Sequence, residues 1–305
     1  MSFSNDVKSE LILAVTDKDK KFACLYGMII FCKQFCSSEI CLQSESTAVA
    51  EIFPKLIKEI FKGKVKINED IINRKNGSVL YSFIINDKAS IELIASTFNF
   101  DPEQREIDIK KIDNNSLPNF IAGAFLSCGS VTNPNNEYHL EFVLPVKQLY
   151  DDLSVIFKSI GLINKMVIRK NSYILYFKES ENIEDILTFM GAQGSTLELI
   201  NVKILKDVRN RVNRISNCDM ANCNKIIEAA LKQKIDIELI DKTVGIESLP
   251  ETLQEIAFAR LNNPELSLKE LGETLDPPLG RSGVNHRLKR LTQIADNIRS
   301  RNLLL

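Results

Sequence analysis

The sequence lacks most of the short motifs by which enzymes are recognised. It has no glycine-rich phosphate loop and no nucleophile elbow. The one carboxylate pair that stands out, Asp151-Asp152, falls early in an expected helix, where acidic side chains suit the helix dipole. These absences argue against an enzyme, so we expect no catalytic residue and no cofactor.

Metal-ligand spacing is also missing. The chain has two histidines, His139 and His286, and its seven cysteines include no Cys-x-x-Cys pair. Structural zinc usually takes its ligands from tighter pairs, so we expect no metal site and interpret the cysteines as small buried apolar residues. An odd number of cysteines in a chain of this size, with no export signal, indicates reduced thiols.

Long apolar runs are absent as well. No segment reaches the roughly 18 uninterrupted apolar residues of a membrane span, and the first residues do not resemble a signal peptide. We therefore expect a cytoplasmic protein without a membrane partner. Its 305 residues, 44% hydrophobic and 26% charged, are typical of a globular chain with room for two domains.

Charge is distributed unevenly along the chain. Residues 1–202 carry 22 basic and 26 acidic side chains, whereas residues 203–305 carry 17 and 14. The overall charge of -1 thus hides a basic C-terminal part. A basic surface favours a polyanion as partner.

The basic excess gathers on one expected helix near the C-terminus. Its apolar positions share one side and its polar positions the other. The apolar side holds Val284, Leu288, Leu291 and Ile298. Arg, Lys, Asn and Ser are side chains that contact phosphates and base edges in a major groove. We predict that the DNA-binding residues are Arg281, Ser282, Asn285, His286, Arg287, Lys289 and Arg290. A solvated helix face is the alternative reading.

Two further helices are expected just before it. Pro250 suits the first turn of a helix that continues to about residue 262, and Asn263-Pro264 ends it. Ser267 and Glu270 form a capping box for a short second helix, which Asp276-Pro277-Pro278 stops. Three helices with a basic third one predict a helix-turn-helix over residues 246–305. The long second connection favours a sigma-factor-like variant.

The first 202 residues contain a repeat with a period of roughly ninety-five residues. Each copy shows the order helix, strand, helix, hairpin, helix. Copy one is expected as helix 21–36, strand 40–44, helix 47–61, strands 64–72 and 78–85 around a turn at 74–77, and helix 88–98. Copy two is expected as helix 117–128, strand 138–143, helix 146–160, strands 165–170 and 173–178, and helix 181–190.

The first helix of each copy carries a recognisable motif. Ile121-Ala-Gly-Ala-Phe-Leu-Ser-Cys-Gly129 resembles the LAGLIDADG signature of homing endonucleases, and residues 25–33 resemble it more weakly. The resemblance implies that the two helices pack through Gly27 and Gly123, where a missing Cβ allows close approach. It also implies an acidic metal ligand at the eighth position. Cys32 and Cys128 stand there instead, and a neutral thiol cannot replace a carboxylate on magnesium.

The segment between the repeat and the helix-turn-helix, residues 203–245, is expected to be a helical linker. Asn210, Asn213, Asn217 and Asn224 would share one face of a continuous helix. Asparagine is a poor interior helix former, so the amides on that face could bind a partner or phosphates. Alternatively, Ser216 and Asp219 cap a second helix and the asparagines mark a break; we favour this structural reading.

The combination resembles the WhiA family of bacterial regulators. Residues 2–10 are similar to its opening helix, residues 209–222 to its Arg/Asn-rich linker and residues 282–288 to its recognition helix. Lys33 departs from the motif, which leads us to expect a glycine at this position. The resemblance implies a DNA-binding protein linked to sporulation, cell division and chromosome segregation.

We therefore expect an α+β protein: a tandem LAGLIDADG-like repeat (residues 1–202, halves about 1–110 and 111–202) followed by an all-α helix-turn-helix domain. Its expected partner is double-stranded DNA, bound sequence-specifically or as a nucleoid-associated monomer. A regulatory protein that binds the repeat or the linker is a second candidate partner. The alternative functions are a residual metal-dependent endonuclease and a DNA-anchored protein-interaction scaffold.

Overall fold

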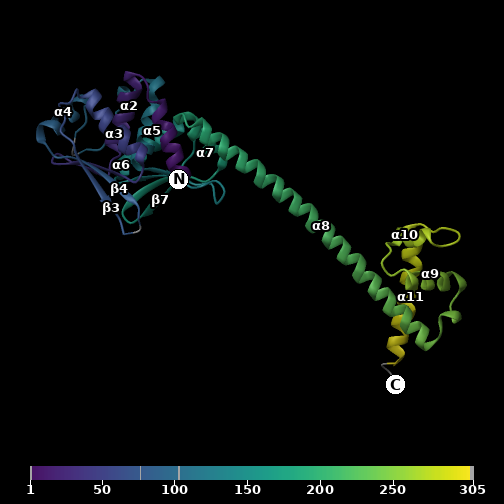
Figure 1. Ribbon diagram of the computed structural model, residues 1–305. Helices are drawn as coiled ribbons and strands as arrows, with labels where there is room; N and C mark the ends of the chain where they lie inside the picture. The colour runs from purple at the N-terminus through teal and green to yellow at the C-terminus, as the bar shows by residue number, and fades with distance from the viewer. Residues whose placement is uncertain (1, 76, 102–103, 303–305) are drawn as a thin grey trace. The chain divides into compact units, whose positions relative to one another are not determined.

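A computed structural model describes residues 2–75, 77–101 and 104–302. The chain forms two compact units, Met1–Lys206 and Asp207–Leu305. Helix α8, Gln193–Thr243, begins in the first unit and continues into the second (Figure 1). In the described ranges, no helix is long and apolar enough to cross a membrane.

The first unit contains the expected repeat, with each copy adding one short strand after its first helix. The first copy follows α1 (Phe3–Leu11) and consists of α2 (Lys18–Ile30), β1 (Gln34–Phe35), β2 (Ile40–Ser44), α3 (Thr47–Ile60), β3 (Asn68–Asn73), β4 (Val79–Ile85) and α4 (Lys88–Phe98). The second consists of α5 (Leu117–Cys128), β5 (Gly129–Val131), β6 (Leu140–Leu144), α6 (Lys147–Ser159), β7 (Lys165–Arg169), β8 (Ser172–Phe177) and α7 (Ser180–Met190). The expected turn at 74–77 includes Asn76, which lies outside the described residues.

The two sheets have the same topology. Their strand orders are β1-β2-β4-β3 and β5-β6-β8-β7, and every pairing is antiparallel. Leu42 pairs with Phe83 in the first sheet, and Phe142 pairs with Leu175 in the second. All four side chains are buried in the hydrophobic core that the sheets share with the helices of this unit. The α/β repeat predicted from the sequence is therefore confirmed.

One predicted helix boundary in the repeat is wrong. The helix expected over residues 21–36 ends at Ile30, and Gln34 and Phe35 pair with β2 instead. Phe31 and Phe35 are both buried and are four residues apart, a spacing that also fits a helix. Strand pairing replaces the helical hydrogen bonds here. The carbonyl oxygen of Cys32 accepts a hydrogen bond from Arg105 at 3.0 Å.

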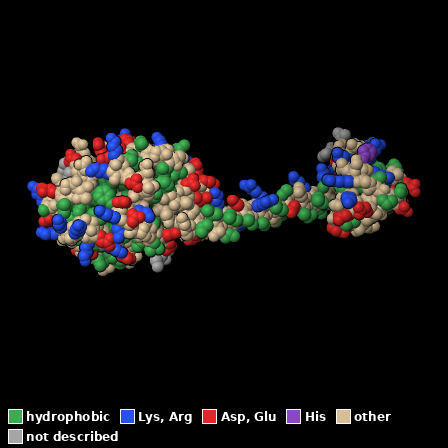
Figure 2. Space-filling model, turned by 90° about the horizontal axis from the view of Figure 1, so that it is seen from above, with side chains coloured by type: hydrophobic (Ala, Val, Ile, Leu, Met, Phe, Trp, Pro, Cys, Tyr) green, Lys and Arg blue, Asp and Glu red, His purple; other side chains and the backbone are tan. Residues whose placement is uncertain are grey.

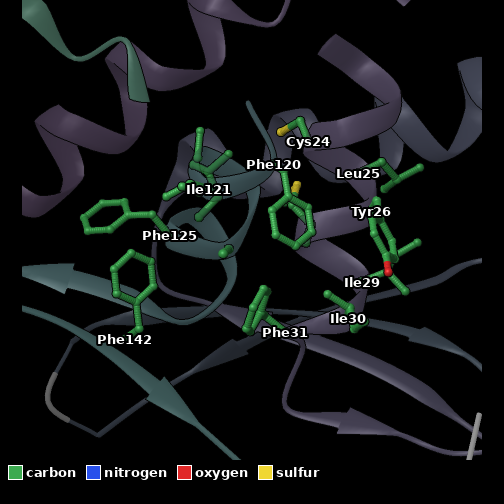
Figure 3. Packing of buried hydrophobic residues seen from close by; sticks show 14 of the residues in the cluster. Cys24, Leu25, Tyr26, Ile29, Ile30, Phe31, Phe120, Ile121, Phe125 and Phe142 are labelled. Atoms are coloured by element: carbon green, nitrogen blue, oxygen red, sulfur yellow. The ribbon is translucent and has the colours of Figure 1, made fainter. Parts of the chain in front are cut away.

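Helices α2 and α5 form the centre of the first unit, where the two copies meet. Figure 3 shows Phe120 of α5 next to Tyr26 of α2 and next to Phe31, which follows α2; the ring centroids lie 5.3 Å and 6.0 Å from that of Phe120. A Cβ at Gly27 would lie 2.3 Å from the carbonyl oxygen of Phe120, and one at Gly123 would lie 2.1 Å from that of Cys24. Only glycine allows this approach. The expected packing through Gly27 and Gly123 is confirmed.

The favoured break near Ser216 and Asp219 is wrong, because α8 is continuous over 51 residues. Its sequence from Ser195 to Val244 contains neither glycine nor proline. An asparagine inside a helix costs at most about 0.7 kcal/mol relative to alanine. Ending the helix and nucleating a second one would cost more free energy than that. Asn210, Asn213, Asn217 and Asn224 are exposed.

The second unit is a helical bundle with its own core. The end of α8 packs with α9 (Glu251–Asn262), α10 (Leu268–Glu273) and α11 (Arg281–Asn302). Ile240, Ile256, Leu271 and Val284 provide one core residue from each helix. The predicted capping box is present: Glu270 N donates to Ser267 Oγ, and Ser267 N donates to Glu270 Oε2.

Candidate DNA-binding surface

Helix α11 has the two faces that its sequence predicts. Val284, Leu288 and Leu291 are at most 2% exposed and fix the helix to the core. On the opposite side, Arg281, Ser282, His286, Lys289 and Arg290 are exposed, and Asn285 is half-buried. In Figure 2 the histidine of the C-terminal unit lies beside Lys and Arg side chains. The structure thus places Ser282, Asn285, His286 and Lys289 on the side of α11 away from its core, with Arg281 and Arg290 at the two edges of that surface. We call this surface the α11 front face.

Arg287 is the exception. It lies about 100° around the helix from His286 and turns toward α9. Its guanidinium donates to the carbonyl oxygen of Thr252 at 3.2 Å and pairs with Glu255 at 3.3 Å. Its side chain is 24% exposed. Because these contacts tie Nη1 of its guanidinium to α9, Arg287 positions α11 on α9 in this structure.

The cations of the front face differ from Arg287 in their ion pairing. In the described part of the chain, Arg281, Lys289 and Arg290 take part in no ion pair. Arg299, which follows on the same helix, is different, because it binds Asp236 of α8 at 2.5 Å and Asp296 at 2.8 Å. Three uncompensated cations next to polar side chains make the front face suited to phosphates and base edges.

The connection from α10 to α11 fixes where the front face begins. Residues 274–280 form it, so the long connection predicted from the sequence is present. Leu279 N donates to the carbonyl oxygen of Gly272 at 2.9 Å, and a Cβ on Gly272 would lie 1.9 Å from the Leu279 carbonyl oxygen. Gly272 is therefore required for the chain to fold back closely over α10.

Two supporting residues were missed by sequence reasoning. Arg260 of α9 is 1% exposed, and its guanidinium donates to the carbonyl oxygen of Leu266 at 2.7 Å, holding the turn before α10. Asp236 of α8 is buried and binds Arg299. A charged residue in a helical sequence pattern is normally expected on the solvated face. No local sequence signal therefore distinguished Arg260 and Asp236 from exposed charged residues.

The positions that correspond to the acidic ligands of the LAGLIDADG motif hold thiols, of which Cys32 is buried and Cys128 is half-buried. Burial raises the pKa of Cys32 and the pKa of Cys128 to about 12 each, so both thiols are neutral near pH 7. The Cys32 thiol donates to the carbonyl oxygen of Gln34 at 2.9 Å. Neutral sulfur atoms are poor ligands for hard cations such as magnesium.

Cationic side chains also approach these positions. Lys8 is 9% exposed and donates to the carbonyl oxygen of Leu126 at 3.3 Å. The Arg105 guanidinium lies 3.7 Å from the Cys32 sulfur. Both cations interact electrostatically with Cys128, which holds the second of the two positions. A divalent cation would meet fixed positive charge here. Among the described residues, no group of three or more His, Cys, Asp or Glu side chains could hold a metal ion.

A LAGLIDADG-like repeat with cysteines at the acidic-ligand positions, followed by a helix-turn-helix, is an architecture typical of DNA-binding proteins. Two family models match the chain: the WhiA LAGLIDADG-like domain over residues 117–209 and the WhiA C-terminal HTH domain over residues 212–295. The chain belongs to the WhiA family.

Relatives and solved structures agree with this assignment. The chain is 36% identical to a probable cell division protein WhiA of Clostridium perfringens, covering 99% of this chain and 100% of that protein. It is 38% identical to a probable cell division protein WhiA of Clostridium botulinum, covering 98% and 99%. A crystal structure of full-length WhiA from Thermatoga maritima matches with a TM-score of 0.56 and 26% identity, covering 97% of this chain and 99% of that one. The N-terminal LAGLIDADG domain of WhiA matches in fold with a TM-score of 0.50 and 21% identity, covering 63% and 91%.

Proposed function

We propose that this protein is a DNA-binding regulator of cell division and that it reads duplex DNA with the α11 front face. The names of its Clostridium relatives support the process, and the helix-turn-helix supports the partner. The observation that carries the proposal is the set of unpaired cations and polar side chains on a helix whose other side is fixed in a core. The proposal includes sequence-specific binding and roles in chromosome segregation or sporulation.

Each front-face residue has a role in this proposal. Ser282, Asn285 and His286 face bases, since hydroxyl, amide and imidazole groups can donate to and accept from base edges. Arg281, Lys289 and Arg290 attract phosphates, a contribution that does not depend on sequence. Arg287 holds α11 against α9 through Glu255, so its role in this proposal is to position the reading helix.

Binding-site selection with three variants tests these roles. Asn285→Ala should relax base preference at one position, on the order of 1–3 kcal/mol. Lys289→Ala should weaken binding to all sequences and reduce the salt slope by about one unit. Lys232→Ala removes an exposed lysine of α8 outside the front face and is the matched control. Full base preference in Asn285→Ala would show that bases are read elsewhere.

A protein partner belongs to the same proposal, because α8 exposes apolar side chains. Val208, Val212 and Ile215 are each more than half exposed and lie within about 60° of one another on the helix. Arg209, Arg211 and Arg214 flank them and would repel a second copy, so we propose a monomer that binds a different protein. A photo-crosslinker at position 212 should capture one defined protein in cells, whereas one at position 210, on the opposite side of the helix, should not.

A further inference from the structure

A cavity of about 360 Å³ lies within the C-terminal unit, between α8, α10 and α11. This volume falls in the range of small-ligand sites, roughly 300–1,000 Å³. The cavity shares Arg281 and Asn285 with the α11 front face. Whatever fills it therefore lies beside the residues that we assign to DNA.

The lining of the cavity is strongly cationic. Lys225 of α8, Arg260 of α9, Lys269 of α10 and Arg281 of α11 all contribute to it, and no acidic residue is found among the described residues of the lining. Lys225 and Arg281 form no ion pair within the described ranges. Lys269 has only a distant partner, Glu273, at 4.0 Å. The cavity thus gathers positive charge from four helices, and Lys225 and Arg281 contribute theirs without an ion pair among the described residues.

Two buried polar atoms at the cavity have no partner among the described residues. They are Nε of Arg260 and Oε1 of Gln233. The Arg260 side chain is almost fully buried, and its Nη1 is already engaged with the carbonyl oxygen of Leu266. A buried donor without an acceptor costs free energy, and an oxygen-rich ligand would recover it once the Arg260 side chain turns this nitrogen toward the cavity. The Gln233 amide can turn to present its NH₂ group to the same ligand.

We propose that this cavity binds a phosphate-type anion. Guanidinium and ammonium groups are the side chains that hold such oxyanions, and Ile226 and Leu268 leave room for an apolar or planar part of the ligand. The anion can come from the DNA backbone or from a free phosphorylated molecule. The first source deepens the proposed function and rests on it, whereas the second depends only on the lining of the cavity.

The test measures the binding of inorganic pyrophosphate to the full chain by calorimetry. Lys225→Gln removes one cation, and Ala229→Glu places a carboxylate at the lining from an exposed helical position. Both substitutions lie on the surface of α8, so the core of the unit is unchanged. Each should weaken pyrophosphate binding at least about fivefold. Lys232→Gln, an exposed lysine of α8 outside the cavity, should bind pyrophosphate like the wild type.

A second arm identifies the source of the anion from the salt dependence of duplex DNA binding. A backbone phosphate in the cavity predicts that Lys225→Gln lowers the salt slope by about one unit and that pyrophosphate competes with DNA. If the natural ligand is a free phosphorylated molecule, Lys225→Gln should lose pyrophosphate binding and keep the salt slope of DNA binding unchanged. Either result supports the proposal. It is overturned if Lys225→Gln and Ala229→Glu match Lys232→Gln in both arms. A chain that binds pyrophosphate through Lys225 but binds no DNA would refute the proposed function and leave the cavity assignment standing.

Discussion

Single residues decide whether the repeat can act as a nuclease. The sequence alone identified Cys32 and Cys128 at the positions of the acidic ligands, because the motif fixes them by count. It could not identify Lys8 and Arg105, which reach these positions from residues 8 and 105 through the fold. Neutral thiols and two nearby cations together oppose a divalent metal.

We predict that the purified protein does not cleave DNA in the presence of magnesium or manganese. The reason is electrostatic, since the thiols stay protonated up to a pKa of about 12 and supply no negative charge to a metal. Plasmid and chromosomal fragments incubated with each ion provide the measurement. Cleavage that survives further purification and disappears on changing Cys32 and Cys128 to serine would contradict the prediction.

Lys8 gives a second prediction at this scale. Burial lowers its pKa from 10.5 to about 8, so the unfolded chain binds the proton more tightly than the folded one. The free energy of unfolding should therefore rise with pH above 8. Relative to Lys8→Met, the wild type should gain about 1 kcal/mol between roughly pH 7 and pH 9. Urea denaturation of both proteins across this range measures the difference, and parallel pH profiles would show that Lys8 is not desolvated.

At the scale of elements, most helices and strands were predictable because their periodic patterns are local. The helix at residues 117–128 and the one at residues 88–98 were expected with the bounds that the structure shows. The two failures have a common cause. The end of α2 depends on pairing with β2, and the continuity of α8 depends on the balance between asparagine propensity and helix nucleation. Neither competition is visible in a short window of sequence.

The packing of α2 against α5 leaves no room for one additional carbon atom at the glycine contact. Gly123→Ala would place a Cβ 2.1 Å from the backbone oxygen of Cys24, a contact that no rotamer change can relieve. We predict a loss of at least about 3 kcal/mol in the free energy of unfolding of the first unit. Gly280→Ala, where a Cβ meets nothing within 4 Å, is the control. Chemical denaturation of both variants gives the measurement. Similar midpoints for the two would mean that the helices can separate at little cost.

The whole molecule contains two hydrophobic cores, and the parts of the chain that form them differ in net charge. One core comprises the repeat, and the other joins the end of α8 to α9, α10 and α11. The acidic balance of residues 1–202 and the basic balance of residues 203–305 follow the same division. The sequence indicated this organisation through composition and the repeat. It did not show that the end of α8 belongs to the C-terminal core, because Ile237 and Ile240 lie far from the helix-turn-helix pattern.

This division predicts that residues 1–206 fold alone and bind DNA much more weakly than the full chain. The boundary keeps the last contacts of α8 with the repeat, because Leu199 is 1% exposed in that core and Lys206 donates to the carbonyl oxygen of Pro134 at 2.6 Å. The fragment should therefore show one cooperative thermal transition. It lacks the α11 front face, and its acidic balance repels a polyanion.

Gel-shift titration of the fragment and of the full chain at one salt concentration measures the difference in affinity. The full chain with Lys289→Ala and Arg290→Ala is the matched comparison, since it keeps both cores and loses two exposed cations of the front face. We expect this variant to fall toward the fragment in affinity, because phosphate contacts dominate binding to duplex DNA. Equal affinity of the fragment and the unmodified full chain would instead assign DNA binding to the sheets of the repeat. The helix-turn-helix would then need a different partner.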